Sequence, residues 1–320
     1  MTGDLRGSLT EAAYTTGWTA VRRMPAPMAR RLFTTAADQA WRRRSKGVRQ
    51  LERNLARVRP AATPEQLREL SRAGMRSYLR YWSEAFRLPD LTPEQIVSSF
   101  VMDDEHNLAD GLATGRGVVV SLPHMGNWDH AGAWATLRHA RVVSVAERLQ
   151  PEGLYERFLD YRRALGMEIL PLTGGEPPFR TLMSRLRDGG LVALLGDRDL
   201  TRAGVPVQMF GETTKLPAGP AALAVSTGAV LLTATLWYDP THSRGRMHPP
   251  VEVPSHGSKQ DKILAMTQAT ADRFAEGIRQ YPQDWHMLQR LWLSDLDPAK
   301  AAAAAAQDPA QDTDPTAGQL

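Results

Sequence analysis

The feature that most constrains the fold is a strand, turn and helix pattern in residues 117–134, GVVVSLPHMGNWDHAGAW. The valines at 118–120 are β-branched and are followed closely by Pro123, which predicts a short buried strand that ends at the proline. Apolar residues then recur at helical spacing, and Asn127 or Asp129 is placed to cap the start of that helix. A buried strand that leads into a helix is the repeating unit of an α/β protein.

The same alternation continues along the rest of the chain. We expect strands at 141–146, 167–170, 191–195 and 229–237, an edge strand at 251–253, and helices at 154–165, 178–187, 221–227 and 259–279. The residues before Gly117 are expected to be helical throughout, with helix starts at the capping boxes TPEQ at 63–66 and at 92–95. The predicted fold class is therefore α/β, with a central, mostly parallel sheet flanked by helices on both faces.

The basic charge of the chain is concentrated in its N-terminal 60 residues. Residues 1–60 contain thirteen Lys and Arg against four Asp and Glu, a balance of +9, while the whole chain carries +4. These cations alternate with aromatic and aliphatic side chains, a composition that suits amphipathic helices at an anionic bilayer surface. A solvated helix face or a nucleic-acid patch would have a similar composition, but no nucleic-acid-binding module accompanies it and no such partner is expected.

Three regions follow from this reading. Residues 1–60 are predicted to be basic amphipathic helices that associate with a membrane surface, 61–300 the main domain, and 301–320 a disordered low-complexity tail. The segment 216–238 lacks charge and is long enough to span a bilayer, but its prolines and glycines predict a helix capped by Gly228 and then a buried strand. The start of the chain shows no apolar signal-peptide region, and the absence of cysteine excludes disulfides and a Cys acyl-enzyme.

His124 and Asp129 bring acid–base chemistry to the first turn. An aspartate that accepts the proton of one imidazole nitrogen fixes the tautomer and leaves the other nitrogen free as a general base. The alternative is that Asp129 only caps the helix or holds the turn together. Adjacent Asp and His side chains rarely converge on one ion, so no metal site is expected at His124, Asp129 and His130.

Four sequence blocks carry a family resemblance. PHMGNWDHAGAW resembles the His-x4-Asp block of the bacterial acyltransferases that modify lipid A and phosphatidylinositol mannosides. Three more blocks follow in the same order: AERLQPEGLYERFLDYRRALGMEILPL at 146–172, LLGDRDLTRAGVPVQMFGETTKLPAGPAALAVSTGA at 194–229, and YPQDWHMLQRLWLSDL at 281–296. The segments AERL and DWHMLQ are more similar to the actinobacterial phosphatidylinositol mannoside branch than to the lipid A branch.

The resemblance implies a function. It implies transfer of a fatty acyl chain, with palmitoyl expected, from acyl-coenzyme A to a mannose hydroxyl of a phosphatidylinositol mannoside. It also implies a peripheral location at the cytoplasmic face of the plasma membrane, with acyl-coenzyme A as co-substrate and no further cofactor. The alternatives are a different glycolipid acceptor, similar to lipid A, and a metal-dependent hydrolase that uses the same turn.

The other candidate site residues follow predicted strands. Asp197, Arg198 and Asp199 come after the strand at 191–195, so Asp197 is a second candidate partner for His124, and Arg198 a candidate for binding an acyl carbonyl or a phosphate. The resemblance implies an acidic site residue here without distinguishing Asp197 from Asp199. Salt bridges within this loop are the structural alternative.

Two further substrate-binding candidates lie in the second block. Glu147 follows the strand at 141–146, and Arg162 belongs to an Arg-x3-Gly spacing that resembles that of the family. An arginine fork suits an anionic lipid or a coenzyme phosphate, although such residues are usually only solvated. Trp285 and His286 are expected to be packing residues. The chain has no Gly-x-Ser-x-Gly elbow, Walker A sequence or dinucleotide fingerprint.

Overall fold

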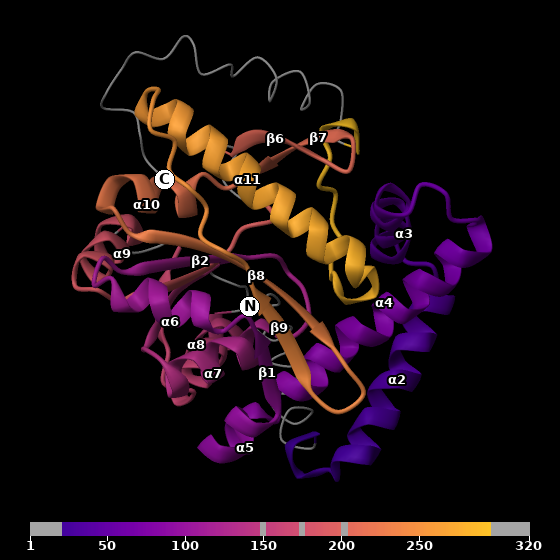
Figure 1. Ribbon diagram of the computed structural model, residues 1–320. Coiled ribbons are helices and arrows are strands. Elements are labelled where there is room, and N and C mark those ends of the chain that lie inside the picture. Colours follow the sequence, from indigo (N-terminus) through magenta and orange to yellow (C-terminus); the bar gives the residue numbers. More distant parts are fainter. Residues whose placement is uncertain (1–20, 148–151, 173–176, 200–203, 296–320) are drawn as a thin grey trace, which may run out of the picture.

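The structure, a computed structural model, describes residues 21–147, 152–172, 177–199 and 204–295. The predicted tail at 301–320 and the first 20 residues of the basic region lie outside these ranges. Within them, a seven-stranded sheet forms the centre of the molecule and helices cover both of its faces (Figure 1).

The central sheet is mostly parallel. In spatial order its strands are β1 (Phe100–Asp103), β9 (Ser243–Met247), β8 (Val230–Tyr238), β2 (Val118–Leu122), β5 (Leu191–Leu195), β3 (Val142–Ala146) and β4 (Glu168–Pro171). Of these neighbouring pairs, β8 and β9 run antiparallel and the other five run parallel. The predicted fold class, α/β with a mostly parallel central sheet, is confirmed.

Alternating side chains of β2 enter two different cores, as the period of a strand requires. Val118, Val120 and Leu122 face one core, and Val119 faces the other. The first core is covered by α5 (Pro93–Ser98), α6 (His106–Ala113), α7 (Trp128–Arg138) and α8 (Glu152–Ala164), and the second by α9 (Pro178–Arg187), α10 (Gly219–Thr227) and α11 (Lys259–Gln280). Because both faces are covered, the central strands β2 and β5 read as nearly continuous apolar runs.

The first three described helices form a bundle beside the sheet. The helices α2 (Ala26–Arg42) and α3 (Lys46–Val58) pack against α4 (Pro64–Ala85) around a small apolar cluster that includes Leu51, Leu55 and Met75. Both predicted capping boxes are present: the hydroxyls of Thr63 and Thr92 accept hydrogen bonds from the third backbone N–H of α4 and α5. These boxes fix where the helices begin.

The uncharged segment at 216–238 folds as predicted. It contains the end of β7, the helix α10, and the strand β8, and Gly228 ends α10 with a left-handed φ of 77°. Among the described residues, no helix combines the length and the apolar character needed to cross a bilayer.

Two predictions about strands are wrong, and three further strands were not predicted. Residues 100–103, expected to be helical, form the edge strand β1, which pairs with the unpredicted β9. The sequence SRGRM of β9 was not recognised as a strand because arginines take the place of apolar residues. These arginines point away from the core, where Arg244 pairs with Asp103 at 2.8 Å. The hairpin of β6 (Val205–Met209) and β7 (Glu212–Leu216) was also unpredicted, and residues 251–253 form no strand.

Candidate active site

The strands β2 and β5 bring the two central side chains together. In their parallel register Leu122 lies opposite Leu195, so His124 and Asp197, each two residues further on, leave the sheet side by side. Gly196 permits this close approach, because a Cβ atom there would lie 2.2 Å from the hydroxyl oxygen of Ser121. The site therefore lies at the carboxyl ends of adjacent parallel strands, where open α/β sheets bind ligands.

The imidazole of His124 contacts the carboxylate of Asp197. Nδ1 of His124 lies 2.6 Å from Oδ1 of Asp197, and the backbone N–H of His124 donates to Oδ2 at 3.0 Å. The carboxylate accepts the Nδ1 proton in this arrangement. The His124 side chain is 29% exposed, and its Nε2 makes no hydrogen bond within the described part of the chain. One ring nitrogen is thus held in place and the other is accessible.

Asp197 is an ionised carboxylate in a buried place. Its side chain is 0% exposed, and Nε1 of Trp285 donates a third hydrogen bond to Oδ2 at 3.0 Å. Burial alone would raise the pKa of Asp197, but the charge on His124 and the hydrogen bonds from His124 and Trp285 outweigh it and hold the pKa below its ordinary value. A carboxylate that stays negative can stabilise a positive charge on the imidazole.

Asp129 has different partners. It accepts hydrogen bonds from the hydroxyl of Tyr81 and from Nε of Arg162, each at 2.8 Å, and is 3% exposed. The cap of α7 is Asn127, whose side chain accepts from the backbone N–H of His130. Asp129 therefore neither caps the helix nor contacts the imidazole, which corrects the expectation that it pairs with His124.

Arg162 is a half-buried cation beside this acid, with 19% of its side chain exposed, and so it is not a freely solvated residue of a helix surface. Burial would lower the pKa of Arg162, but the neighbouring Asp129 and the tyrosines Tyr81 and Tyr161 raise it above its ordinary value. Its Nε atom is used by Asp129, while its two terminal nitrogens make no hydrogen bond to any residue that the structure describes. The guanidinium can therefore offer these donors to a substrate.

The remaining predicted residues follow the strands β3 and β5 at their carboxyl ends. Arg198 lies 3.6 Å from Glu147, so their ion pair joins the carboxyl ends of β5 and β3. Asp199 accepts a hydrogen bond from the backbone N–H of Gly204 at 2.8 Å. The sequence left open a salt bridge between Arg198 and its neighbours in the loop. In the structure Arg198 pairs instead with Glu147, which follows the neighbouring strand β3. Within the described residues, no group of three or more His, Asp or Glu side chains is placed to hold a metal ion.

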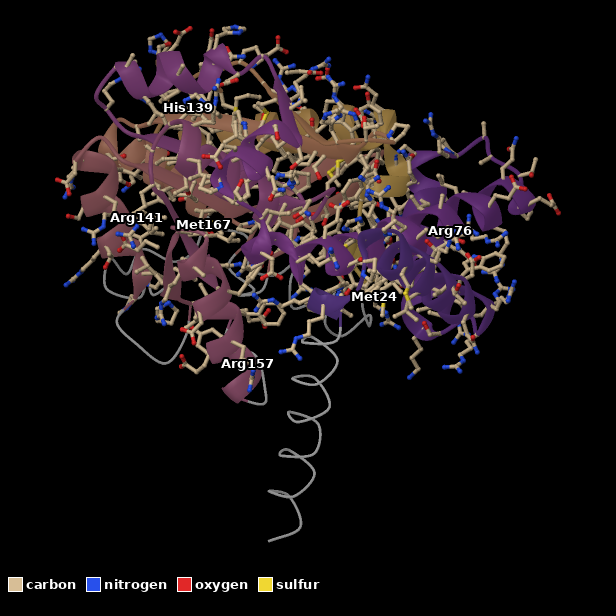
Figure 2. The ribbon with its side chains drawn as sticks, turned by 90° about the horizontal axis from the view of Figure 1, so that it is seen from below. Met24, Arg76, His139, Arg141, Arg157 and Met167 are labelled. Carbon is tan, nitrogen blue, oxygen red and sulfur yellow. The ribbon has the colours of Figure 1, made fainter. Side chains whose placement is uncertain are left out.

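An apolar cavity of about 80 Å³ lies close to this site, between the sheet and α7. Leu122 and Leu195, which precede the two central residues by two positions, line it, and so does Trp128, whose ring meets that of His124 edge to face at 5.5 Å. Asp129 and Arg162 are the charged residues of its lining. Met167, labelled in Figure 2, lines the cavity where α7 approaches β4.

The fold and the site define an α/β protein with a His–Asp pair at the carboxyl ends of two parallel strands, close to an apolar cavity. The sequence model of the family described as bacterial lipid A biosynthesis acyltransferase matches residues 6–294 of the chain. The chain belongs to this family, which confirms the resemblance found in its four sequence blocks.

Two relatives are similar along almost their whole length. The phosphatidylinositol mannoside acyltransferase of Mycolicibacterium smegmatis is 46% identical over 302 residues, which cover 93% of this chain and 96% of the relative. The protein of the same name from Mycobacterium tuberculosis is 46% identical over 309 residues, which cover 93% of this chain and 95% of the relative.

The sequence did not reveal two parts of the site. Tyr81 reaches Asp129 from α4, and Trp285 reaches Asp197 from the segment after α11, although Trp285 was expected only to pack. The one available signal for Trp285 was its place in the DWHMLQ block, which resembles the family. Trp285 and Asp197 are 88 residues apart, and their sequence separation does not predict that they touch.

Proposed function

We propose that the protein transfers a palmitoyl chain from acyl-coenzyme A to a mannose hydroxyl of a phosphatidylinositol mannoside, with His124 as the general base. The observation that carries the proposal is the His124–Asp197 pair with an accessible Nε2 beside an apolar cavity. The acceptor is supported by the two relatives described above, each of which is named as a phosphatidylinositol mannoside acyltransferase.

The chemistry is direct transfer. Nε2 of His124 takes the proton of the sugar hydroxyl, and the oxygen attacks the thioester carbonyl to form a tetrahedral intermediate. Its collapse breaks the carbon–sulfur bond, and the imidazolium returns the proton to the leaving thiolate. Asp197 stabilises the imidazolium between these steps, a role like that of the aspartate in serine hydrolase triads.

Each remaining candidate has a place in the scheme. The fatty chain occupies the apolar cavity, and the free donors of Arg162, positioned by Asp129, stabilise the negative charge on the carbonyl oxygen. Arg198, Glu147 and Asp199 contact the polar part of the donor or of the glycolipid. No metal and no further cofactor take part in this scheme.

The α2 surface supports peripheral binding to an anionic membrane, which we place at the cytoplasmic face of the plasma membrane. Met28 and Leu32 are 58% and 49% exposed on this helix, beside the exposed Arg30 and Arg31. Exposed apolar side chains next to cations are typical of helices that lie in the interface of anionic lipids.

An acceptor panel tests the proposal. Purified protein is incubated with labelled palmitoyl-coenzyme A and a phosphatidylinositol mono- or dimannoside, a lipid A precursor, or no acceptor, each with and without EDTA. We expect labelled mannoside, unaffected by EDTA. Transfer only to the lipid A precursor would identify the other glycolipid class, and EDTA-sensitive hydrolysis without transfer would identify a metal-dependent hydrolase.

A further inference from the structure

The segment 284–286 contacts the backbone around His124 and the carboxylate of Asp197, although it lies far away in sequence. The backbone N–H of His286 donates to the carbonyl of His124 at 2.8 Å, and the backbone N–H of Gly126 donates to the carbonyl of Asp284 at 2.9 Å. Trp285 lies between them and donates its indole N–H to Asp197 at 3.0 Å. One short segment therefore fixes the backbone that carries the imidazole and also fixes the carboxylate.

The close backbone pairing depends on a glycine. Gly126 has a φ of 57°, and a Cβ atom there would lie 2.8 Å from Cβ of Leu236 and 2.9 Å from the backbone nitrogen of Trp237. Larger residues would push the turn that carries His124 away from the sheet. The turn is thus held between β8 on one side and the segment 284–286 on the other.

The segment is itself anchored to α4. The hydroxyl of Ser77 donates to Oδ1 of Asp284 at 2.6 Å, and Nε2 of His286 lies 2.9 Å from the same hydroxyl. Asp284 also accepts from the backbone N–H of Tyr238 at 3.2 Å. These buried contacts leave Trp285 little freedom, so its N–H is presented to Asp197 at low entropic cost.

From these contacts we propose that Trp285 is a positioning residue for acyl transfer, whose indole N–H holds the carboxylate of Asp197 in line with the imidazole of His124. This inference rests on the proposed function, because it assigns Trp285 to the same reaction. Oδ2 of Asp197 receives the indole N–H and the backbone N–H of His124, which leaves Oδ1 facing Nδ1. Without the indole donor the carboxylate can rotate, and its negative charge is less stabilised.

Trp292 offers a matched control. Both tryptophans are 0% exposed, belong to the same apolar cluster and contact the ring of Phe210, with centroids 6.2 and 6.1 Å away. Both donate an indole N–H, but that of Trp292 goes to the side chain of Asn54 at 3.2 Å and not to the catalytic pair. The two Trp→Phe variants therefore remove the same atoms from the same core, and only one of them removes a donor to Asp197.

His286 is a titratable group that acts on the pair, and burial and then the charge of His124 lower its pKa to about 3. His286 therefore stays neutral throughout the range in which the enzyme is assayed. Burial raises the pKa of Asp284, in the same segment, to about 6, so the acidic limb of the pH–rate profile is compared between Trp285→Phe and Trp292→Phe, which both keep Asp284.

The experiment compares Trp285→Phe, Trp292→Phe and a variant with benzothienylalanine at position 285, which keeps the ring shape but lacks the N–H. Hydrogen bonds to charged groups predict a loss in kcat of about 10- to 100-fold for both changes at position 285, with KM for acyl-coenzyme A nearly unchanged. The acidic limb should move to higher pH, because the carboxylate loses a donor that lowers its pKa. Trp292→Phe should lower the melting temperature comparably but keep kcat within about threefold.

Two results would overturn the inference. One is a benzothienylalanine variant with wild-type kcat and an unmoved acidic limb. The other is a Trp292→Phe variant that loses as much kcat as Trp285→Phe, because the effect would then come from packing. Failure of the proposed function would give a different result. An active His124→Ala enzyme would show that His124 is not the general base, whatever the tryptophan variants show.

Discussion

Replacing Asp197 with asparagine tests the electrostatic part of the mechanism. The side chain keeps its shape but loses its charge, and its amide N–H₂ would donate to Nδ1 of His124 in place of accepting from it. The imidazole proton would then move to Nε2, the atom that must accept the proton of the sugar hydroxyl. The change therefore removes both the orientation of the base and the charge that stabilises the imidazolium.

The expected loss follows from the geometry. Nδ1 and Oδ1 are 2.6 Å apart, which places the centres of the two charges about 4 Å from each other. At the effective dielectric constant of about 20 that suits protein sites, this pair contributes about 4 kcal/mol, or about three powers of ten in rate. We expect kcat of Asp197→Asn to fall about 10³-fold.

The assay measures initial rates with labelled palmitoyl-coenzyme A and a phosphatidylinositol mannoside, alongside the melting temperature of each variant. Asp160→Asn is the control, because Asp160 is exposed on α8, where it pairs with Arg163. A folded Asp197→Asn enzyme with more than a tenth of wild-type kcat would refute the reasoning, as would an equal loss in Asp160→Asn.

Three further predictions concern other parts of the structure. Arg162→Gln should destabilise the fold by about 3 kcal/mol, because it leaves the buried Asp129 unpaired, and adding Asp129→Asn should restore stability but not activity in unfolding and rate measurements. Burial raises the pKa of Asp284 to about 6, so its protonated form stabilises the fold, and this contribution is complete below the unfolded pKa of about 4 and is lost as the pH rises through 6. Urea unfolding of wild type and Asp284→Asn should therefore show a stability difference that changes by about 3 kcal/mol between pH 4 and pH 7. Replacing Met28 and Leu32 with serine should weaken binding to anionic vesicles at least tenfold in sedimentation assays, because each apolar side chain contributes about 1.5–3 kcal/mol when fully buried.

Each of these predictions has a contrary result. A stable Arg162→Gln variant would show that the guanidinium is not needed to neutralise Asp129. A stability difference for Asp284→Asn that does not change with pH would contradict a raised pKa. For the membrane face, the control replaces Leu137 and Leu264, which are also exposed but lie on α7 and α11. Equal vesicle binding by the α2 variant and the wild type would refute a role for α2.

The sequence predicted those parts of the fold whose local signals agree with their environment. The valines of β2, the capping boxes of α4 and α5, and Gly228 each specify an element through their own chemistry. The strand β9 was missed because it lies next to an edge strand, where arginines replace the apolar alternation and gain acidic partners only after folding. The local sequence does not predict such ion pairs between residues of two different strands.

The site was predictable only in part for a similar reason. The sequence placed both His124 and Asp197 after strands, but the adjacency of β2 and β5 is a property of the sheet order, since their strands are about 70 residues apart along the chain. The spacing from His124 to Asp129 suggested a pair, yet the turn directs Asp129 toward Arg162 and Tyr81. Which way a side chain faces in such a turn depends on partners that the local sequence does not contain.

The most direct test of the central claim is the rate of acyl transfer by His124→Ala. If Nε2 of His124 takes the proton of the acceptor hydroxyl, this variant should lose at least 10³-fold in kcat with palmitoyl-coenzyme A and a phosphatidylinositol mannoside, while its circular dichroism spectrum stays that of a folded protein. A folded His124→Ala enzyme that transfers the chain at a rate near that of the wild type would contradict the account.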